Sequence, residues 1–199
     1  MKTKSLLAAL ALTSLATVPL TAAAQDAGSW LVRGRALYLD SANKDSTPLD
    51  LSVNNKTFPE LDISYFYTPN IAVELVLTYP QKHDLKAGSD KIGSVKHLPP
   101  TLTAQYHFTG LGPVRPYVGA GINATLFSGI NVPEGVSIKK SSFGLAIGAG
   151  VDVPVGGGWF VNADLKKVQI KTDVSAAGSK LGTFKIDPTL FSIGVGKQF

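Results

Sequence analysis

Histidine is the side chain most often used as an acid, a base or a metal ligand near neutral pH, and this chain has three. Two of them, His83 and His97, lie in one polar stretch. The other side chains there that a hydrolase could use are Asp84, Ser89, Asp90 and Ser94. A serine, histidine and acid constellation requires a fixed mutual geometry, and no spacing here is diagnostic of one. Loop histidines beside polar residues are usually solvated, so we predict no catalytic residue and no enzyme activity.

The third histidine, His107, has no second histidine and no pair of carboxylates at metal-ligand spacing on its own segment. The sequence also contains no cysteine, which excludes disulfides, thiolate metal sites and a cysteine nucleophile. We therefore predict neither a metal nor another cofactor. The formal net charge of +5 is too small to indicate binding of nucleic acid.

The first residues are typical of an export signal. Lys2 and Lys4 precede an apolar run from Leu6 to Leu20, and the alanines at 22–24 provide a small-residue cleavage site. The run contains Pro19 and is shorter than the roughly 20 apolar residues that a membrane-spanning helix needs. We predict a cleaved signal peptide over residues 1–24 and one exported domain over residues 25–199.

No later segment is apolar for long enough to form a membrane helix, so membrane insertion would have to use strands. Alternation of large with small or polar side chains predicts eight strands, most of them near the roughly 9 to 11 residues that a tilted membrane strand needs. The predicted strands are Trp30–Leu39, Phe58–Tyr67, Ile71–Pro80, Leu98–Phe108, Arg115–Phe127, Ser141–Val153, Trp159–Ile170 and Lys185–Phe199.

The connections between these strands alternate in length. Those after the second, fourth and sixth strands are short, whereas those after the first, third, fifth and seventh run for about a dozen residues or more. This alternation is typical of an up-and-down barrel in the Gram-negative outer membrane, with short periplasmic turns and long extracellular loops. A soluble sandwich is the alternative, but it would not need such alternation. We predict an all-β, eight-stranded antiparallel transmembrane β-barrel.

One face of each predicted strand is apolar and would contact lipid, as for Leu61, Ile63 and Tyr65 in the second strand. Aromatic residues gather at the predicted periplasmic strand ends, where a membrane-interface girdle belongs. They are Trp30, Tyr67, Tyr106, Phe108, Trp159 and Phe199. An aromatic last strand is typical of outer-membrane barrels, so we expect Phe199 to be the C-terminal signal for the outer-membrane assembly machinery.

Residues Leu98–Thr101 have the sequence LPPT, and residues Arg115–Asn123 have the sequence RPYVGAGIN. These blocks resemble the central signature of the OmpW/AlkL family of Gram-negative outer-membrane proteins, and similar blocks extend the likeness over essentially the whole predicted domain. The resemblance implies an eight-stranded barrel associated with the passage of small hydrophobic molecules. The chain departs from the family pattern at Lys166 and Lys167, where relatives often carry aromatic or apolar residues.

The opposite strand faces would line the lumen, and they differ between its two ends. Toward the periplasm we predict a salt-bridged polar plug of Arg33, Arg35, Glu74, Gln105, His107, Tyr117, Asp152, Asn162 and Asp164. Toward the exterior we predict an apolar lumen lined by Leu37, Leu39, Val76, Val168, Ile170 and Leu190. Glu60 and Asp62 point inward in this upper half, against the pattern, unless a bulge near Pro59 moves them.

These faces predict an apolar cup above a polar floor. An oily molecule would enter the cup, but its apolar surface gains nothing among paired charges, which favours exit sideways between strands. We expect the opening between the fifth and sixth strands, which carry Gly119, Gly121, Gly144, Gly148 and Gly150. The alternative is that these glycines only make room for bulky side chains in the lumen.

The competing hypothesis is a plugged barrel without transport, whose surface contacts lipopolysaccharide, a phage or a bacteriocin. Lysines outnumber acids in the predicted loops and could meet lipopolysaccharide phosphates, or could simply be solvated. A closed barrel has no free edge, so we expect a monomer. The expected partners are outer-membrane lipid and lipopolysaccharide, a small hydrophobic solute and the assembly machinery.

Overall fold

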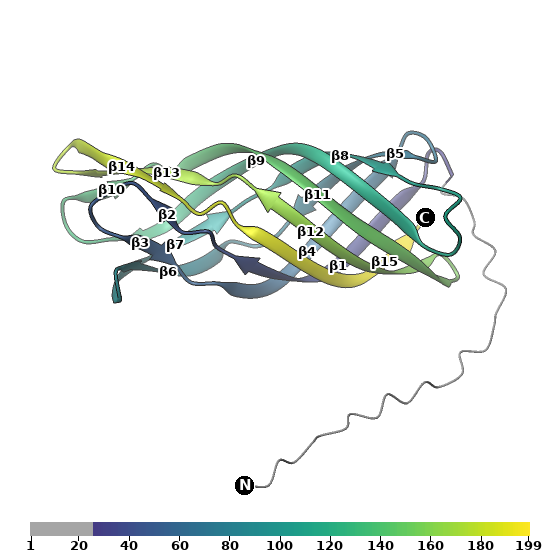
Figure 1. The fold of residues 1–199 in the computed structure, drawn as a ribbon, viewed down its shortest axis with the longest axis horizontal. Coiled ribbons are helices and arrows are strands. Elements are labelled where there is room, and N and C mark those ends of the chain that lie inside the picture. The colour runs from purple at the N-terminus through teal and green to yellow at the C-terminus, as the bar shows by residue number, and fades with distance from the viewer. Residues whose placement is uncertain (1–25) are drawn as a thin grey trace, which may run out of the picture.

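The computed structural model describes residues 26–199, in which no helix is long and apolar enough to cross a membrane. The predicted signal peptide lies outside the described residues. In the described part of the chain, eight antiparallel strands close into a barrel (Figure 1). They are β1 (Trp30–Asp40), β4 (Lys56–Phe66), β5 (Ile71–Leu77), β8 (Thr101–His107), β9 (Arg115–Asn131), β11 (Ser141–Gly156), β12 (Trp159–Val168) and β15 (Thr189–Gln198). The barrel closes where β1 pairs with β15, from Leu31 opposite Gln198 to Asp40 opposite Thr189.

Each barrel strand alternates between the outer surface and the lumen, as the period of two in the sequence predicts. In β12, exposed and buried residues alternate at every position. The outward side chains are large and apolar, and some are strongly exposed, with Phe143 at 74% and Ile193 at 68%. A continuous apolar surface of this kind on a closed barrel fits lipid rather than water.

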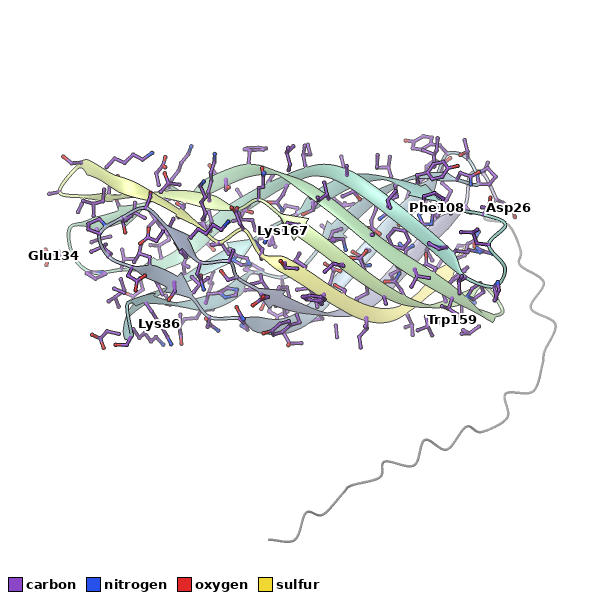
Figure 2. The ribbon with its side chains drawn as sticks, in the orientation of Figure 1. Asp26, Lys86, Phe108, Glu134, Trp159 and Lys167 are labelled. Atoms are coloured by element: carbon purple, nitrogen blue, oxygen red, sulfur yellow. The ribbon has the colours of Figure 1, made fainter. Side chains whose placement is uncertain are left out.

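Aromatic side chains surround one end of the barrel. Tyr65 lies between Trp30 and Tyr67, with ring centroids 4.9 Å from each, and Tyr106 lies 5.1 Å from Phe108. Figure 2 shows Phe108, Trp159 and Asp26 at this end and Lys86 and Glu134 at the opposite one. The short turns and the C-terminus also lie at the aromatic end, which we call the turn end (Figure 1).

The long connections are not open loops, and this corrects the sequence-based expectation. They contain β2 (Lys44–Asp45), β3 (Leu51–Val53), β6 (Gln81–Ala87), β7 (Asp90–Leu98), β10 (Val136–Ile138), β13 (Lys171–Ala176) and β14 (Ser179–Lys185). The sheet order β9-β7-β6-β3 continues the barrel wall, and β10-β13-β14-β2 form a second sheet. We call these strands the hairpin extension.

Four barrel strands are shorter than predicted. The seventh ends at Val168 rather than Ile170, and the eighth runs from Thr189 to Gln198 rather than from Lys185 to Phe199. The third ends at Leu77 rather than Pro80, and the fourth begins at Thr101 rather than Leu98. The lost residues include Pro80, Pro99 and Pro100, which have no N–H to donate to a neighbouring strand.

The lumen contains two separate apolar clusters. The larger runs from the upper barrel into the hairpin extension and includes Leu37, Phe58, Ile170 and Phe184. The smaller lies at the turn end and consists of Leu31, Phe66, Ala72 and Phe160. The charged side chains of the lumen belong to neither cluster, so apolar groups occupy both ends of the interior.

Candidate functional site

Arg33 is fully buried in the lumen and links its own strand, β1, to three other strands. Its Nε and Nη2 lie 3.1 and 2.6 Å from the two carboxylate oxygens of Asp152 on β11, a bidentate pair. Its Nη1 donates to Glu74 on β5 at 2.9 Å and to Ser64 on β4 at 3.0 Å. Because β1, β5 and β11 lie on different sides of the barrel, this one guanidinium bridges the lumen.

Arg35 makes a second set of contacts one step further along β1. Its Nε lies 2.9 Å from Glu60 and 2.5 Å from Asp62, and its Nη1 donates to Asn162 at 3.0 Å. Glu60 and Asp62 therefore do point inward. The pairing of β1 with β4 is regular from Trp30 to Leu39, so the described ladder has no bulge near Pro59 that would turn these two side chains away from the lumen.

Lys166 also belongs to this network, a role that its departure from the family pattern did not predict. Its Nζ lies 2.7 Å from Asp164 and 3.6 Å from Glu60, and its side chain is almost fully buried. The alternation of the strand could have shown this. Lys166 lies two residues from Asp164 and two from Val168, and because both of those were predicted to face the lumen, Lys166 should face it too.

The remaining predicted plug residues are buried among these charges. Tyr117 donates its hydroxyl to Asp164 at 2.7 Å, and Asn162 donates to Asp152 at 2.9 Å. His107 contacts Gln105 at 3.0 Å and stacks on Tyr117 with ring centroids 4.8 Å apart. We call the whole set the polar layer: Arg33, Arg35, Glu60, Asp62, Glu74, Gln105, His107, Tyr117, Asp152, Asn162, Asp164 and Lys166.

Among the described residues, the polar layer contains five carboxyl groups and three cationic side chains. Each charged group is within 4 Å of an opposite charge, as buried charges require. The layer presents more acids than bases, so it disfavours an anionic solute. An apolar solute that entered the layer would separate ion pairs, and its own contacts would stabilise neither the exposed carboxylates nor the exposed cations.

Above the polar layer the lumen holds a small apolar cavity of about 20 Å³. Each residue predicted to form the apolar lumen contributes to its lining: Leu37, Leu39, Val76, Val168, Ile170 and Leu190. Glu60 and Lys166 form its floor, where the cavity meets the polar layer. A second small cavity, of about 10 Å³, lies in the hairpin extension between Leu85, Val95, Phe127 and Phe184.

The wall between β9 and β11 is continuous, which argues against the lateral opening that we expected there. The two strands pair without a register shift from Leu126 opposite Ser141 to Arg115 opposite Asp152. A Cβ on Gly150 would lie 2.3 Å from the Tyr117 hydroxyl oxygen, and one on Gly121 would lie 2.6 Å from the Thr103 Cα. The glycines therefore make room for neighbouring groups, as in the alternative interpretation.

A break in the wall lies elsewhere, at residues 78–80. Pairing of β4 with β5 stops at Leu61 opposite Leu77, and pairing of β5 with β8 stops at Val76 opposite Thr101. In the described ladders, residues 78–80 pair with neither neighbour. Side chains satisfy part of the exposed backbone, because Asn123 donates to the Pro99 carbonyl at 3.1 Å and Gln81 donates to the Tyr79 carbonyl at 3.1 Å.

His83 and His97 are buried rather than solvated, which corrects the sequence-based expectation. Their rings stack with centroids 4.5 Å apart, on the inner face of the β6–β7 hairpin. His83 Nδ1 contacts the Asn54 carbonyl at 2.9 Å, and within residues 26–199 neither ring bonds a serine or a carboxylate. The hydrolase arrangement considered from the sequence does not form.

The aromatic girdle, the lipid-facing belt and the buried polar layer define the class of this protein as a transmembrane β-barrel of the outer-membrane type. A model of the OmpW family matches residues 26–199. The chain belongs to the OmpW family, whose members are Gram-negative outer-membrane proteins. The turn end is accordingly periplasmic, and the hairpin extension is extracellular.

Known relatives match along most of the chain. It is 40% identical to the uncharacterized outer-membrane protein y4mB of Sinorhizobium fredii, over 96% of this chain and 90% of the relative. It is 37% identical to outer membrane protein W of Escherichia coli, over 98% and 99%. It is 30% identical to the dibenzothiophene metabolism operon protein PahQ of Pseudomonas aeruginosa, over 82% and 80%. The crystal structure of OprG from Pseudomonas aeruginosa superimposes with a TM-score of 0.76 at 28% identity, over 88% and 97%.

Proposed function

We propose that this barrel carries small hydrophobic molecules passively across the outer membrane. The observation that supports this most is the aliphatic lining of the small cavity directly above the polar layer. An aliphatic lining favours apolar surface by about 25 cal/mol per Å² removed from water. The cavity itself is about 20 Å³, so side chains of the lining would have to move to admit a solute. The name of PahQ, a dibenzothiophene metabolism operon protein, supports the same class of solute, because dibenzothiophene is an apolar polycyclic molecule.

The polar layer closes the axial route for such a solute. Passage straight through would separate Arg33 from Asp152 and Arg35 from Glu60, and breaking one buried pair costs about 3–5 kcal/mol. Exit sideways into the membrane avoids that cost. The break at residues 78–80 is where we place this exit, because Phe58, Thr78 and Pro99 beside it also line the cavity.

Paired cysteines test the exit, since the chain has no cysteine of its own. Continuing the register of Leu61 and Leu77 by two residues puts Pro59 opposite Tyr79. We expect the oxidised Pro59→Cys, Tyr79→Cys variant to take up an apolar solute roughly tenfold more slowly than the same variant after reduction.

The matched control joins β9 to β11 through Ile122→Cys and Leu145→Cys, a directly opposed, outward-facing pair. Oxidation of this control should leave uptake unchanged. The opposite pattern, in which oxidation slows uptake only in the β9–β11 variant, would support a lateral opening between those two strands, as first predicted from their glycines. Slowing in neither variant would rule out lateral exit at both places.

A second candidate function is surface binding of lipopolysaccharide, favoured by two pairs of like charges in the hairpin extension. Lys82 lies directly opposite Lys96, and Lys171 lies directly opposite Lys185, with all four side chains exposed. Like charges in such cross-strand pairs repel, and a bridging phosphate would relieve the repulsion. Replacing the four lysines by glutamine should weaken binding to lipopolysaccharide vesicles; unchanged binding would contradict this candidate.

A further inference from the structure

The stacked pair His83 and His97 lies beside the outer cavity, because each histidine pairs directly with a residue that lines it. Phe127 is the direct partner of His97 across β9, and Val95 is the direct partner of His83 across β6 and β7. Val95 and Phe127 both line the outer cavity. Along β9, Asn123 lines the inner cavity four residues before Phe127, so a solute moving from one cavity to the other passes this wall.

Polar atoms of this wall are buried without partners. In the described residues these are both ring nitrogens of His97, Nε2 of His83 and Oε1 of Gln81, which is the direct partner of His97 across the hairpin. An unsatisfied buried polar group costs about 1–3 kcal/mol, so such groups normally contact water or a ligand. Their gathering on one otherwise apolar wall requires an explanation beyond packing.

The hydrogen-bonding roles of these atoms follow from their other contacts. The β6–β7 hairpin lies outside the lipid-facing belt, and burial lowers the pKa of both histidines, that of His97 to about 3, so both rings are neutral at pH 7. His83 Nδ1 must donate to the Asn54 carbonyl, which leaves Nε2 as an acceptor. Gln81 donates its amide to Tyr79, which leaves Oε1 as an acceptor. His97 supplies one donor and one acceptor.

We propose that His83, His97 and Gln81 form a subsite for the hydroxyl group of an otherwise apolar ligand, such as a medium-chain alcohol or a phenol. This inference rests on the proposed passage function and names its substrate class. A hydroxyl accepts from the His97 N–H and donates to one of the three acceptors, whereas a carboxylate would meet mainly acceptors. A metal ion fits poorly, because nearly parallel rings, 21° apart, do not direct their lone pairs to one point.

Histidine NMR on the whole protein in lipid nanodiscs tests the subsite without any substitution. With 15N-labelled histidine, 1-octanol should shift the ring nitrogens of His83 and His97, whereas octane should not. His107 is the internal control, because it lies in the polar layer bonded to Gln105 and should remain unchanged. If 1-octanol causes no shift, the unpaired ring nitrogens contact only water and the proposed subsite is overturned. An equal shift with octane would also overturn it.

Uptake in cells gives the second readout. The intact protein should favour 1-octanol over octane, and in the His83→Phe, His97→Phe variant that preference should fall roughly fivefold, the effect of losing about one hydrogen bond. The variant's heat-modified gel mobility reports whether it has folded, and an unchanged preference in folded variant overturns the subsite. If neither compound enters faster than in cells without the protein, the passage function fails, and the NMR result still decides the subsite by itself.

Discussion

At the scale of single residues, the lumen depends on charges that are buried but paired. Arg33 contacts Asp152, Glu74 and Ser64, so one side chain joins three other strands across the interior. A buried ion pair is not necessarily more stable than an apolar replacement of the same volume, but removing one partner leaves an uncompensated charge. The polar layer is therefore sensitive to single substitutions.

Arg33→Met should lower the free energy of unfolding by about 3–5 kcal/mol, because it leaves Asp152 and Glu74 buried without their cation. Urea unfolding in lipid vesicles measures this loss. Arg115→Met is the matched control: the Arg115 guanidinium lies 5.1 Å from the centre of the Phe160 ring, and its loss should cost roughly 1 kcal/mol. Equal losses in the two variants would show that the paired charges contribute nothing specific.

The buried histidines predict a pH dependence that is local to the hairpin extension. Burial lowers the pKa of His97 to about 3, from 6.5 in an unfolded chain, and lowers that of His83 as well. When the β6–β7 hairpin opens, its histidines regain their ordinary pKa, so below pH 6.5 the open form binds protons and the closed form does not. The closed form therefore loses stability relative to the open form, by roughly 2 kcal/mol for His97 at pH 5. Above pH 6.5 no loss is expected.

Hydrogen exchange, corrected for its intrinsic pH dependence, checks this in the amides of β6 and β7 at pH 7.5 and pH 5. The β13–β14 hairpin contains no histidine and is the control. Equal protection of β6 and β7 at the two pH values would contradict the neutral, buried state of the histidines.

At the scale of elements, alternation and turn spacing were sufficient to predict the eight barrel strands and the faces that they present. The hairpin extension was not predicted, because its strands have polar outer faces and resemble loops, as in Gln81–Ala87 with Lys82, Asp84 and Lys86. The early end of β5 was readable in principle from Pro80, since proline cannot donate to a ladder. The ion-pair partners within the polar layer depend on which strands face each other across the lumen. A single sequence does not contain that information.

Glycine substitutions test the close packing of β11 against the lumen. Gly150→Ala should destabilise the barrel by about 1–3 kcal/mol, because its Cβ would lie 2.3 Å from the Tyr117 hydroxyl oxygen. Gly34→Ala on β1 meets nothing within 4 Å and should be neutral or slightly stabilising. Unfolding free energies of the two variants give the comparison, and a harmless Gly150→Ala would mean that Tyr117 does not occupy this position.

At the scale of the whole molecule, three levels follow one another along the barrel axis. An apolar interior opens toward the hairpin extension, the polar layer lies beneath it, and a small apolar cluster of Leu31, Phe66, Ala72 and Phe160 closes the periplasmic end. Under the proposed function, this order would admit oily molecules from outside and obstruct polar and ionic ones. It also separates the proposed entry, through the lumen, from the proposed exit, through the wall at residues 78–80.

The most direct test of passage is the uptake of a small apolar compound, beside a polar solute of similar size, in cells whose outer membrane does or does not contain this protein. Our account predicts faster entry of the apolar compound and no change for the polar one. Faster entry of the polar solute would contradict it, because the polar layer would then be an open aqueous pore. Faster entry of neither would mean a plugged barrel whose role lies at the cell surface.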